Sequence, residues 1–166
     1  MALEIIGMDR KHITNALEIY QWYVVNSTAT FQIRDADFAE MEGLLFFDNP
    51  RYRSFEVMED DLLIGYGIIT RYKTREAYDN TAEITVYLAH TSTGKGYGAK
   101  VVSRLEEFAR EQGMHVLIAQ ISGENEGSCK LFARNGYTKC AHYHEVGYKF
   151  GRSLDLVCYE KRLQQQ

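Results

Sequence analysis

Three glycines near the middle of the chain form the segment whose residue types point most directly to chemistry. Residues 93–98 read Thr-Gly-Lys-Gly-Tyr-Gly, after a stretch with strand periodicity and before a strongly amphipathic helical stretch. A helix N-terminus presents unpaired N–H donors and the positive end of the helix dipole, and glycine lets the backbone close on an anion. The segment therefore predicts a phosphate cradle, although a plain glycine-rich turn would have the same composition.

The spacing of these glycines excludes two common nucleotide-binding motifs. A Walker loop requires G-x-x-x-x-G-K-[ST], which this segment lacks. A dinucleotide fingerprint requires a different glycine spacing, a βαβ unit around it and an acidic partner for the ribose. The segment is therefore either an anion-binding loop outside these two motifs or a plain glycine-rich turn.

Glu83 is the carboxylate best placed to work beside that segment. Residues 81–89 alternate in polarity, with Glu83, Thr85 and Tyr87 on one face and apolar residues on the other. A partly desolvated strand carboxylate just ahead of an anion-binding loop can act as a general base through a water molecule. A solvated strand glutamate is the alternative, which the residues alone leave open.

A polar loop before this strand carries a second candidate site. Arg75 offers a guanidinium that suits a bidentate contact to a carboxylate or phosphinate, and Tyr78 follows it closely. Because Arg71 and Lys73 crowd the same loop, an exposed charged loop explains these residues equally well.

Three possible metal ligands occur on one later strand. Cys140, His142 and His144 share a face at a spacing of two residues. Three ligands on one strand without a fourth are a weak zinc signal, so we expect pocket or surface residues and no metal. The wide spacing of Cys129, Cys140 and Cys158 predicts free thiols in a cytoplasmic protein.

Length and charge bound the organisation of the chain. Its 166 residues carry a net charge of −4 and a single proline, with no repeat or low-complexity stretch. This predicts one domain over residues 1–166. The acidic balance argues against nucleic acid and anionic membrane as partners, and no apolar run is long enough to span a bilayer. The first residues lack the pattern of a signal peptide.

Hydrophobic periodicity predicts how these residues are positioned. Helical spacing is found at 11–25, 38–45, 99–112 and 124–134. Strand patterns are found at 3–6, 54–58, 62–70, 81–89, 116–121, 137–145 and 154–161. The order predicts an α/β (α+β) fold with a mixed sheet covered by helices.

The glycine segment resembles the pyrophosphate loop Q/R-x-x-G-x-G/A of the GCN5-related N-acetyltransferase (GNAT) superfamily, which binds acetyl-CoA. Asn125-x-x-Ser128-x-x-Leu131-Phe132, followed by residues 135–137, resembles its second conserved stretch. Thr93 stands where the pattern has Gln or Arg. The resemblance implies a single-domain acetyltransferase fold with a central mixed, mostly antiparallel sheet flanked by helices. It also implies that the backbone at residues 86–88 is splayed from its neighbouring strand to admit the pantetheine arm.

Further segments narrow the resemblance to the phosphinothricin/methionine sulfoximine acetyltransferase family. They are residues 19–20, 28–31, 75–78, 83–88 and 146–152, together with Asp155, while Leu154 replaces a usual Trp. The implied function is acetyl transfer from acetyl-CoA to the α-amine of a small amino acid or analogue, by a homodimer. A peptide or polyamine acetyltransferase of the same fold, and a non-catalytic acyl-CoA sensor, are the alternatives.

The resemblance also assigns the site residues. Glu83 is implied as the general base. Cofactor contacts are implied for Val86, Tyr87, Leu88, Gly94, Lys95, Gly96, Tyr97, Gly98, Ala99, Asn125 and Ser128. Substrate contacts are implied for Phe31, Arg75, Glu76, Ala77, Tyr78, Glu83, Ile84 and Thr85. Asn125 is alternatively a helix N-cap. Phe132, where many relatives have a general acid, has no proton to give.

Overall fold

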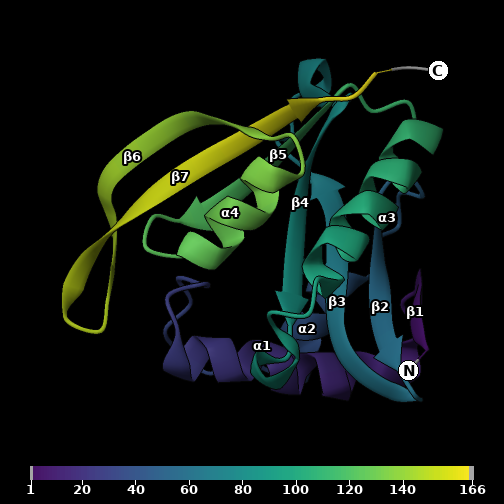
Figure 1. Ribbon diagram of the computed structural model, residues 1–166, viewed down its shortest axis with the longest axis horizontal. Helices are drawn as coiled ribbons and strands as arrows, with labels where there is room; N and C mark the ends of the chain where they lie inside the picture. Colours follow the sequence, from purple (N-terminus) through teal and green to yellow (C-terminus); the bar gives the residue numbers. More distant parts are fainter. Residues whose placement is uncertain (1, 165–166) are drawn as a thin grey trace.

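The computed structural model describes residues 2–164, which alternate between strands and helices in the predicted order (Figure 1). The strands are β1 (Leu3–Gly7), β2 (Arg53–Glu59), β3 (Leu62–Arg71), β4 (Thr81–Leu88), β5 (Val116–Ser122), β6 (Thr138–Lys149) and β7 (Arg152–Arg162). The α-helices are α1 (Ile13–Asn26), α2 (Phe38–Leu45), α3 (Tyr97–Glu111) and α4 (Glu126–Arg134). Short 3-10 turns are η1 (Arg10–His12), η2 (Glu76–Tyr78) and η3 (His90–Ser92).

All seven strands join one sheet in the order β1-β2-β3-β4-β5-β7-β6. Every neighbouring pair is antiparallel except β4 and β5, which are parallel. Two apolar clusters cover the two faces. One joins α3 to inward residues such as Ile69 and Ile84, and the other joins α1 and α2 to Tyr66 and Ile68. The expected mixed, mostly antiparallel sheet flanked by helices is confirmed.

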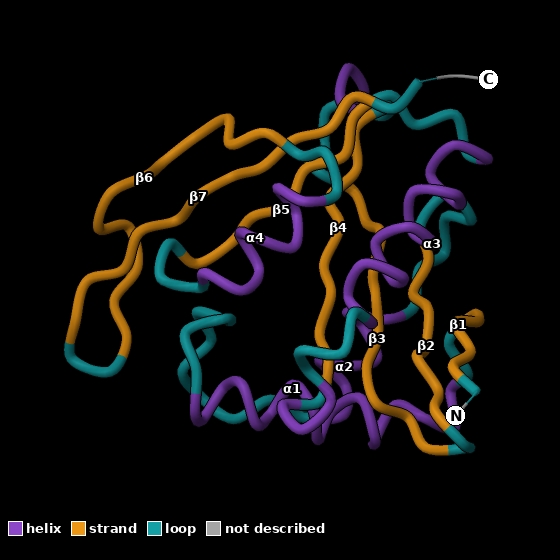
Figure 2. The backbone as a smooth tube through the Cα atoms, viewed as in Figure 1, coloured by secondary structure: helices purple, strands orange, loops and turns teal. Residues whose placement is uncertain are grey.

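The sheet opens between β4 and β5. These strands pair at only three positions, from Thr81↔Val116 to Glu83↔Ile118, whereas β3 follows β4 as far as Gly65↔Leu88. Figure 2 shows the two strands diverging beyond that point, as the resemblance implied. The far half of β4 therefore has one edge free of sheet pairing.

Three expected boundaries were wrong near the C-terminus. α4 begins at Glu126, because Asn125 serves as its N-cap, and β6 and β7 form one long hairpin instead of ending at 145 and starting at 154. Phe150 and Gly151 make the tight turn with φ of 54° and 74°. A bulge between Tyr143 and Gly147 breaks the alternation, and most of β6 is exposed, so the polarity pattern stops while the strand continues.

No helix within residues 2–164 is long and apolar enough to cross a bilayer.

Candidate active site

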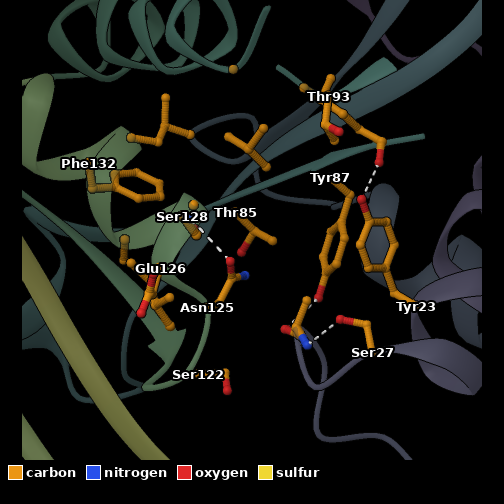
Figure 3. A pocket seen from close by; sticks show the side chains of 18 of the residues that line it. Tyr23, Ser27, Thr85, Tyr87, Thr93, Ser122, Asn125, Glu126, Ser128 and Phe132 are labelled. Atoms are coloured by element: carbon orange, nitrogen blue, oxygen red, sulfur yellow. Dashed lines mark hydrogen bonds between the residues drawn. The ribbon is translucent and has the colours of Figure 1, made fainter. Parts of the chain in front are cut away.

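A cavity of about 950 Å³ occupies the opening between β4 and β5. Figure 3 shows Phe132, Ser128 and Asn125 on one side of it and Tyr87 and Tyr23 on the other. Its wall also includes the glycine segment, the end of β5 and the loop after α1. Segments far apart in the sequence thus meet around one space.

The glycine segment forms the approach to the N-terminus of α3. Gly94 and Gly96 have φ of 75° and 81°, and Gly96 is the N-cap residue of the helix. A β-carbon at either position would meet no atom within 4 Å, so both glycines border open space. Of the residues that the resemblance assigned to the cofactor here, the structure places Gly94, Gly96, Tyr97, Gly98 and Ala99 in the cavity wall, and Lys95 outside it.

The free edge of β4 runs along the cavity. Val86, Tyr87 and Leu88 all line it. Tyr23 donates a hydrogen bond to the carbonyl oxygen of Leu88 at 2.6 Å, and Tyr87 donates to that of Ala29 at 3.3 Å. Burial raises the pKa of both phenols, so they remain protonated donors near neutral pH. These bonds fix the strand edge against α1 and the loop that follows it.

Asn125 serves as a helix cap and as part of the wall. Its side-chain oxygen accepts a hydrogen bond from the Ser128 N–H at 3.1 Å, which is the capping role left open above (Figure 3). Both residues also line the cavity. The cap uses only the amide oxygen, and within residues 2–164 no group accepts a hydrogen bond from the amide N–H donors of Asn125, so these donors are available for a ligand.

Glu83 lies at the last residue pair before β4 and β5 separate. Its Oε1 accepts a hydrogen bond from Gln120 Nε2 at 3.0 Å. Partial burial raises the pKa of the Glu83 carboxyl, while the bond from Gln120 opposes this rise. Gln120 and Thr85 line the cavity but Glu83 does not, so its carboxylate contacts the cavity wall through its hydrogen bond from Gln120.

The expected substrate residues are not brought together. Among residues 2–164, Ile84 and Thr85 belong to the cavity wall, whereas Phe31 does not and packs where a β-carbon on Gly147 would lie. Residues 75–78 lie in an exposed loop that contains η2 and are not part of the wall. The role assigned to Arg75 therefore remains a prediction.

Four wall residues that sequence reasoning did not assign to the site form one polar network. Thr28 donates to Glu124 Oε1 at 2.6 Å, and Arg152 donates to both oxygens of Glu124 at 2.6 and 3.2 Å. Ser122 donates to Thr28 at 3.4 Å. These residues come from three distant segments. The inclusion of residues 28 and 152 in family-like motifs was the only signal for any of them.

The chain matches the family described as "Acetyltransferase (GNAT) domain" over residues 9–158. It belongs to this acetyltransferase family. It is 30% identical to the L-methionine sulfoximine/L-methionine sulfone acetyltransferase of Salmonella typhimurium, over 93% of this chain and 91% of the relative. It is 32% identical to the phosphinothricin N-acetyltransferase of Streptomyces coelicolor, over 88% of both chains.

Solved structures agree with this assignment. An acetyltransferase from Salmonella typhimurium, solved with its cofactor acetyl-CoA, superposes with a TM-score of 0.89 at 30% identity. The match covers all of this chain and 96% of the other. The expected family is therefore confirmed at the level of both sequence and fold.

Phe132 has particular consequences in a GNAT acetyltransferase, because its ring lines the cavity where a proton donor would be useful. It is buried and packs edge-on against Tyr137, with ring centroids 5.1 Å apart. The Tyr137 hydroxyl does not replace the missing donor, since it donates at 2.8 Å to the buried carboxylate of Glu106.

The three candidate metal ligands on β6 separate into two groups. Cys140 turns toward the carbonyl oxygen of Cys158, whereas His142 and His144 stack and lie near Asp155 of β7. Both ring nitrogens of His142 have partners, Asp155 at 2.8 Å and Lys139 at 2.9 Å. A metal ion at His142 would have to displace one of these contacts.

Proposed function

We propose that this chain, as a single domain, transfers the acetyl group of acetyl-CoA to the α-amine of a small amino acid or analogue of the methionine sulfoximine or phosphinothricin type. The observation that carries the proposal is the cavity in the opened sheet, which joins the glycine segment to the free edge of β4. The named activities of the two sequence relatives support the amino-acid substrate.

The shape of the cavity suits coenzyme A. The N–H groups of residues 94–99 would hold the pyrophosphate at the N-terminus of α3. The backbone groups of residues 86–88 that have no strand partner on the β5 side would pair with the amides of the pantetheine arm, as a strand would. Asn125 and Ser128 face this edge from α4 and would bind the arm from the other side (Figure 3).

Glu83 would supply the base. An α-amine arrives mostly as ammonium, and only its free form attacks a thioester. The Glu83 carboxylate would take this proton through water beside Gln120, and its raised pKa improves the match to the task. The thiolate would then leave without help from Phe132, which a thiol pKa of about 8.5 permits.

Assembly and location are further parts of the proposal. β6 is an edge strand with exposed apolar side chains, namely Tyr143 (52%), Val146 (60%) and Tyr148 (67%). We propose that this edge pairs with a second copy in a homodimer, since an open apolar edge favours strand addition. The three free cysteines among residues 2–164 fit a reducing cytoplasm.

A thiol-release assay tests the function directly. Acetyl-CoA would be offered with L-methionine sulfone, L-methionine sulfoximine or phosphinothricin, and in parallel with a peptide or a polyamine. Release with the amino acids supports the proposal. Release only with the peptide or polyamine supports a different acetyltransferase, and acetyl-CoA binding without turnover supports an acyl-CoA sensor.

A further inference from the structure

Three loops meet at the side of the cavity away from the glycine segment. They are the loop after α1, the loop between β5 and α4, and the turn of the β6–β7 hairpin (Figure 1). We call the meeting point the junction and define it by Thr28, Glu124, Lys149 and Arg152. Thr28, Glu124 and Arg152 line the cavity, so one face of the junction is open to a ligand.

Arg152 is oriented so that part of its guanidinium remains free. Its Nε and Nη2 donate to the two oxygens of Glu124, and Glu124 is itself fixed by the Thr28 hydroxyl. Arginine has five N–H donors in a rigid plane. Within residues 2–164, no group accepts a hydrogen bond from Nη1, which leaves that side of the fork for an anion.

The junction carries an excess positive charge. Glu124 balances one of its two cations. The other is Lys149, which is only 3% exposed and donates to the backbone oxygens of Ser27 at 2.7 Å and Thr30 at 2.9 Å. No carboxylate pairs with Lys149 in the described part of the chain. Burial lowers the pKa of Lys149, and an anion arriving nearby would stabilise its charged form.

Within residues 2–164, the cavity wall contains two cationic side chains, Arg152 and Arg134. Arg134 ends α4, one turn after Leu131, which packs against Gly98 at the start of α3. Arg134 therefore belongs to the glycine-segment side of the cavity, where coenzyme A is proposed to bind. Arg152 is the cation left for the second substrate.

We propose that Arg152 binds the α-carboxylate of the amino-acid substrate and that Glu124 is the positioning residue that aims its guanidinium. This inference rests on the proposed function and deepens it. It gives Arg152 the task that the resemblance implied for Arg75, whose loop lies outside the wall. A planar fork held on one side by a carboxylate can bind a second carboxylate on the other.

The test compares an amino acid with the same molecule lacking its carboxylate, namely L-methionine sulfone and 3-(methylsulfonyl)propylamine. Arg152→Ala should lower kcat/KM for the amino acid by about 10- to 100-fold, the range for a charged hydrogen bond. It should leave kcat/KM for the amine and the KM for acetyl-CoA nearly unchanged. Arg152→Lys should recover only part of the loss, because it keeps the charge without the fork.

Glu124→Gln separates positioning from a structural role. It should raise the KM for the amino acid and leave both kcat and the amine reaction nearly unchanged, since only the aim of Arg152 is lost. The matched control is Arg34→Ala, which removes a similar two-bond arginine pair with Glu40 outside the cavity. This control should react like the unaltered protein with both compounds.

Two results would overturn the inference. One is an equal loss by Arg152→Ala for the amino acid and the amine, and the other is no loss for either. If the unaltered protein acetylates neither compound, the proposed function fails. Calorimetry with L-methionine sulfone then still tests the role of Arg152. The assignment is contradicted if the unaltered protein does not bind this compound, or if Arg152→Ala binds it as tightly as the unaltered protein does.

Discussion

The two ends of β4 face different surroundings although they belong to one strand. From Thr81 to Glu83 the strand is paired on both sides, and the polar loop that precedes it is exposed. From residue 84 to 88 it is paired with β3 alone, and all five residues line the cavity. Glu83 lies at the boundary between these two environments.

The difference indicates that the site is made by a gap in the sheet. Where the ladder is complete, backbone groups are satisfied and nothing is left to bind. Where β5 leaves, N–H and C=O groups lose a strand partner beside a space large enough for an extended ligand. A carboxylate at the boundary is partly desolvated and is hydrogen-bonded to Gln120, which lines that space.

Replacing Glu83 should have the largest effect. Glu83→Gln keeps the shape and the contact to Gln120, so fold and acetyl-CoA binding should survive. We expect kcat to fall by about 100-fold or more, the usual worth of a positioned base. The base acts deprotonated, so activity should drop as pH falls through the raised pKa of Glu83, and this acidic limb should vanish in the variant.

Steady-state kinetics from about pH 6 to 9.5 measure both effects. Glu160→Gln is the matched control. Ile118 of β5 pairs with Glu83 on one side and with Glu160 of β7 on the other, so Glu160 is a strand glutamate at the same level of the sheet, two strands away. A normal kcat and an unaltered profile in Glu83→Gln would show that the boundary carboxylate is only a strand glutamate.

A charge placed at the other end of the gap should have the next largest effect. Gly96→Asp adds a negative group to open space at the N-terminus of α3 and a side chain at φ 81°. Acetyl-CoA affinity should weaken at least tenfold, about 1.4 kcal/mol, because the new carboxylate repels the pyrophosphate.

Gly113→Asp controls for strain in this comparison. Gly113 also has open space and a left-handed φ, of 73°, but lies after the opposite end of α3. Calorimetry should find normal acetyl-CoA affinity for this control. Equal weakening in both variants would mean that the glycine segment is only a turn.

The sequence predicted local features better than distant contacts. The alternation of residues 81–89 placed Glu83, Thr85 and Tyr87 correctly on one face, since strand periodicity is a property of neighbouring residues. The junction was missed because Thr28 and Glu124 are 96 residues apart, and no local pattern records such a contact. The hairpin ends were missed for a related reason: β6 projects from the sheet and buries little, so its polarity does not alternate.

Arg75→Ala should have the smallest effect. It tests the end of β4 that is paired on both sides, which the loop containing Arg75 precedes. Arg75 is exposed and its loop lies outside the cavity wall, so any contact it makes to the substrate is screened by water. We expect the KM for the amino acid to rise about threefold, the worth of an exposed ion pair, with the KM for acetyl-CoA unchanged.

Lys73→Ala is the control, because it removes a charge that lies over Tyr72 and Tyr78 in the same loop. Equal changes in both variants would indicate that the loop acts through its general charge or shape. A loss as large as that expected for Arg152→Ala would contradict the comparison, because substrate recognition would then lie at the exposed end of the strand.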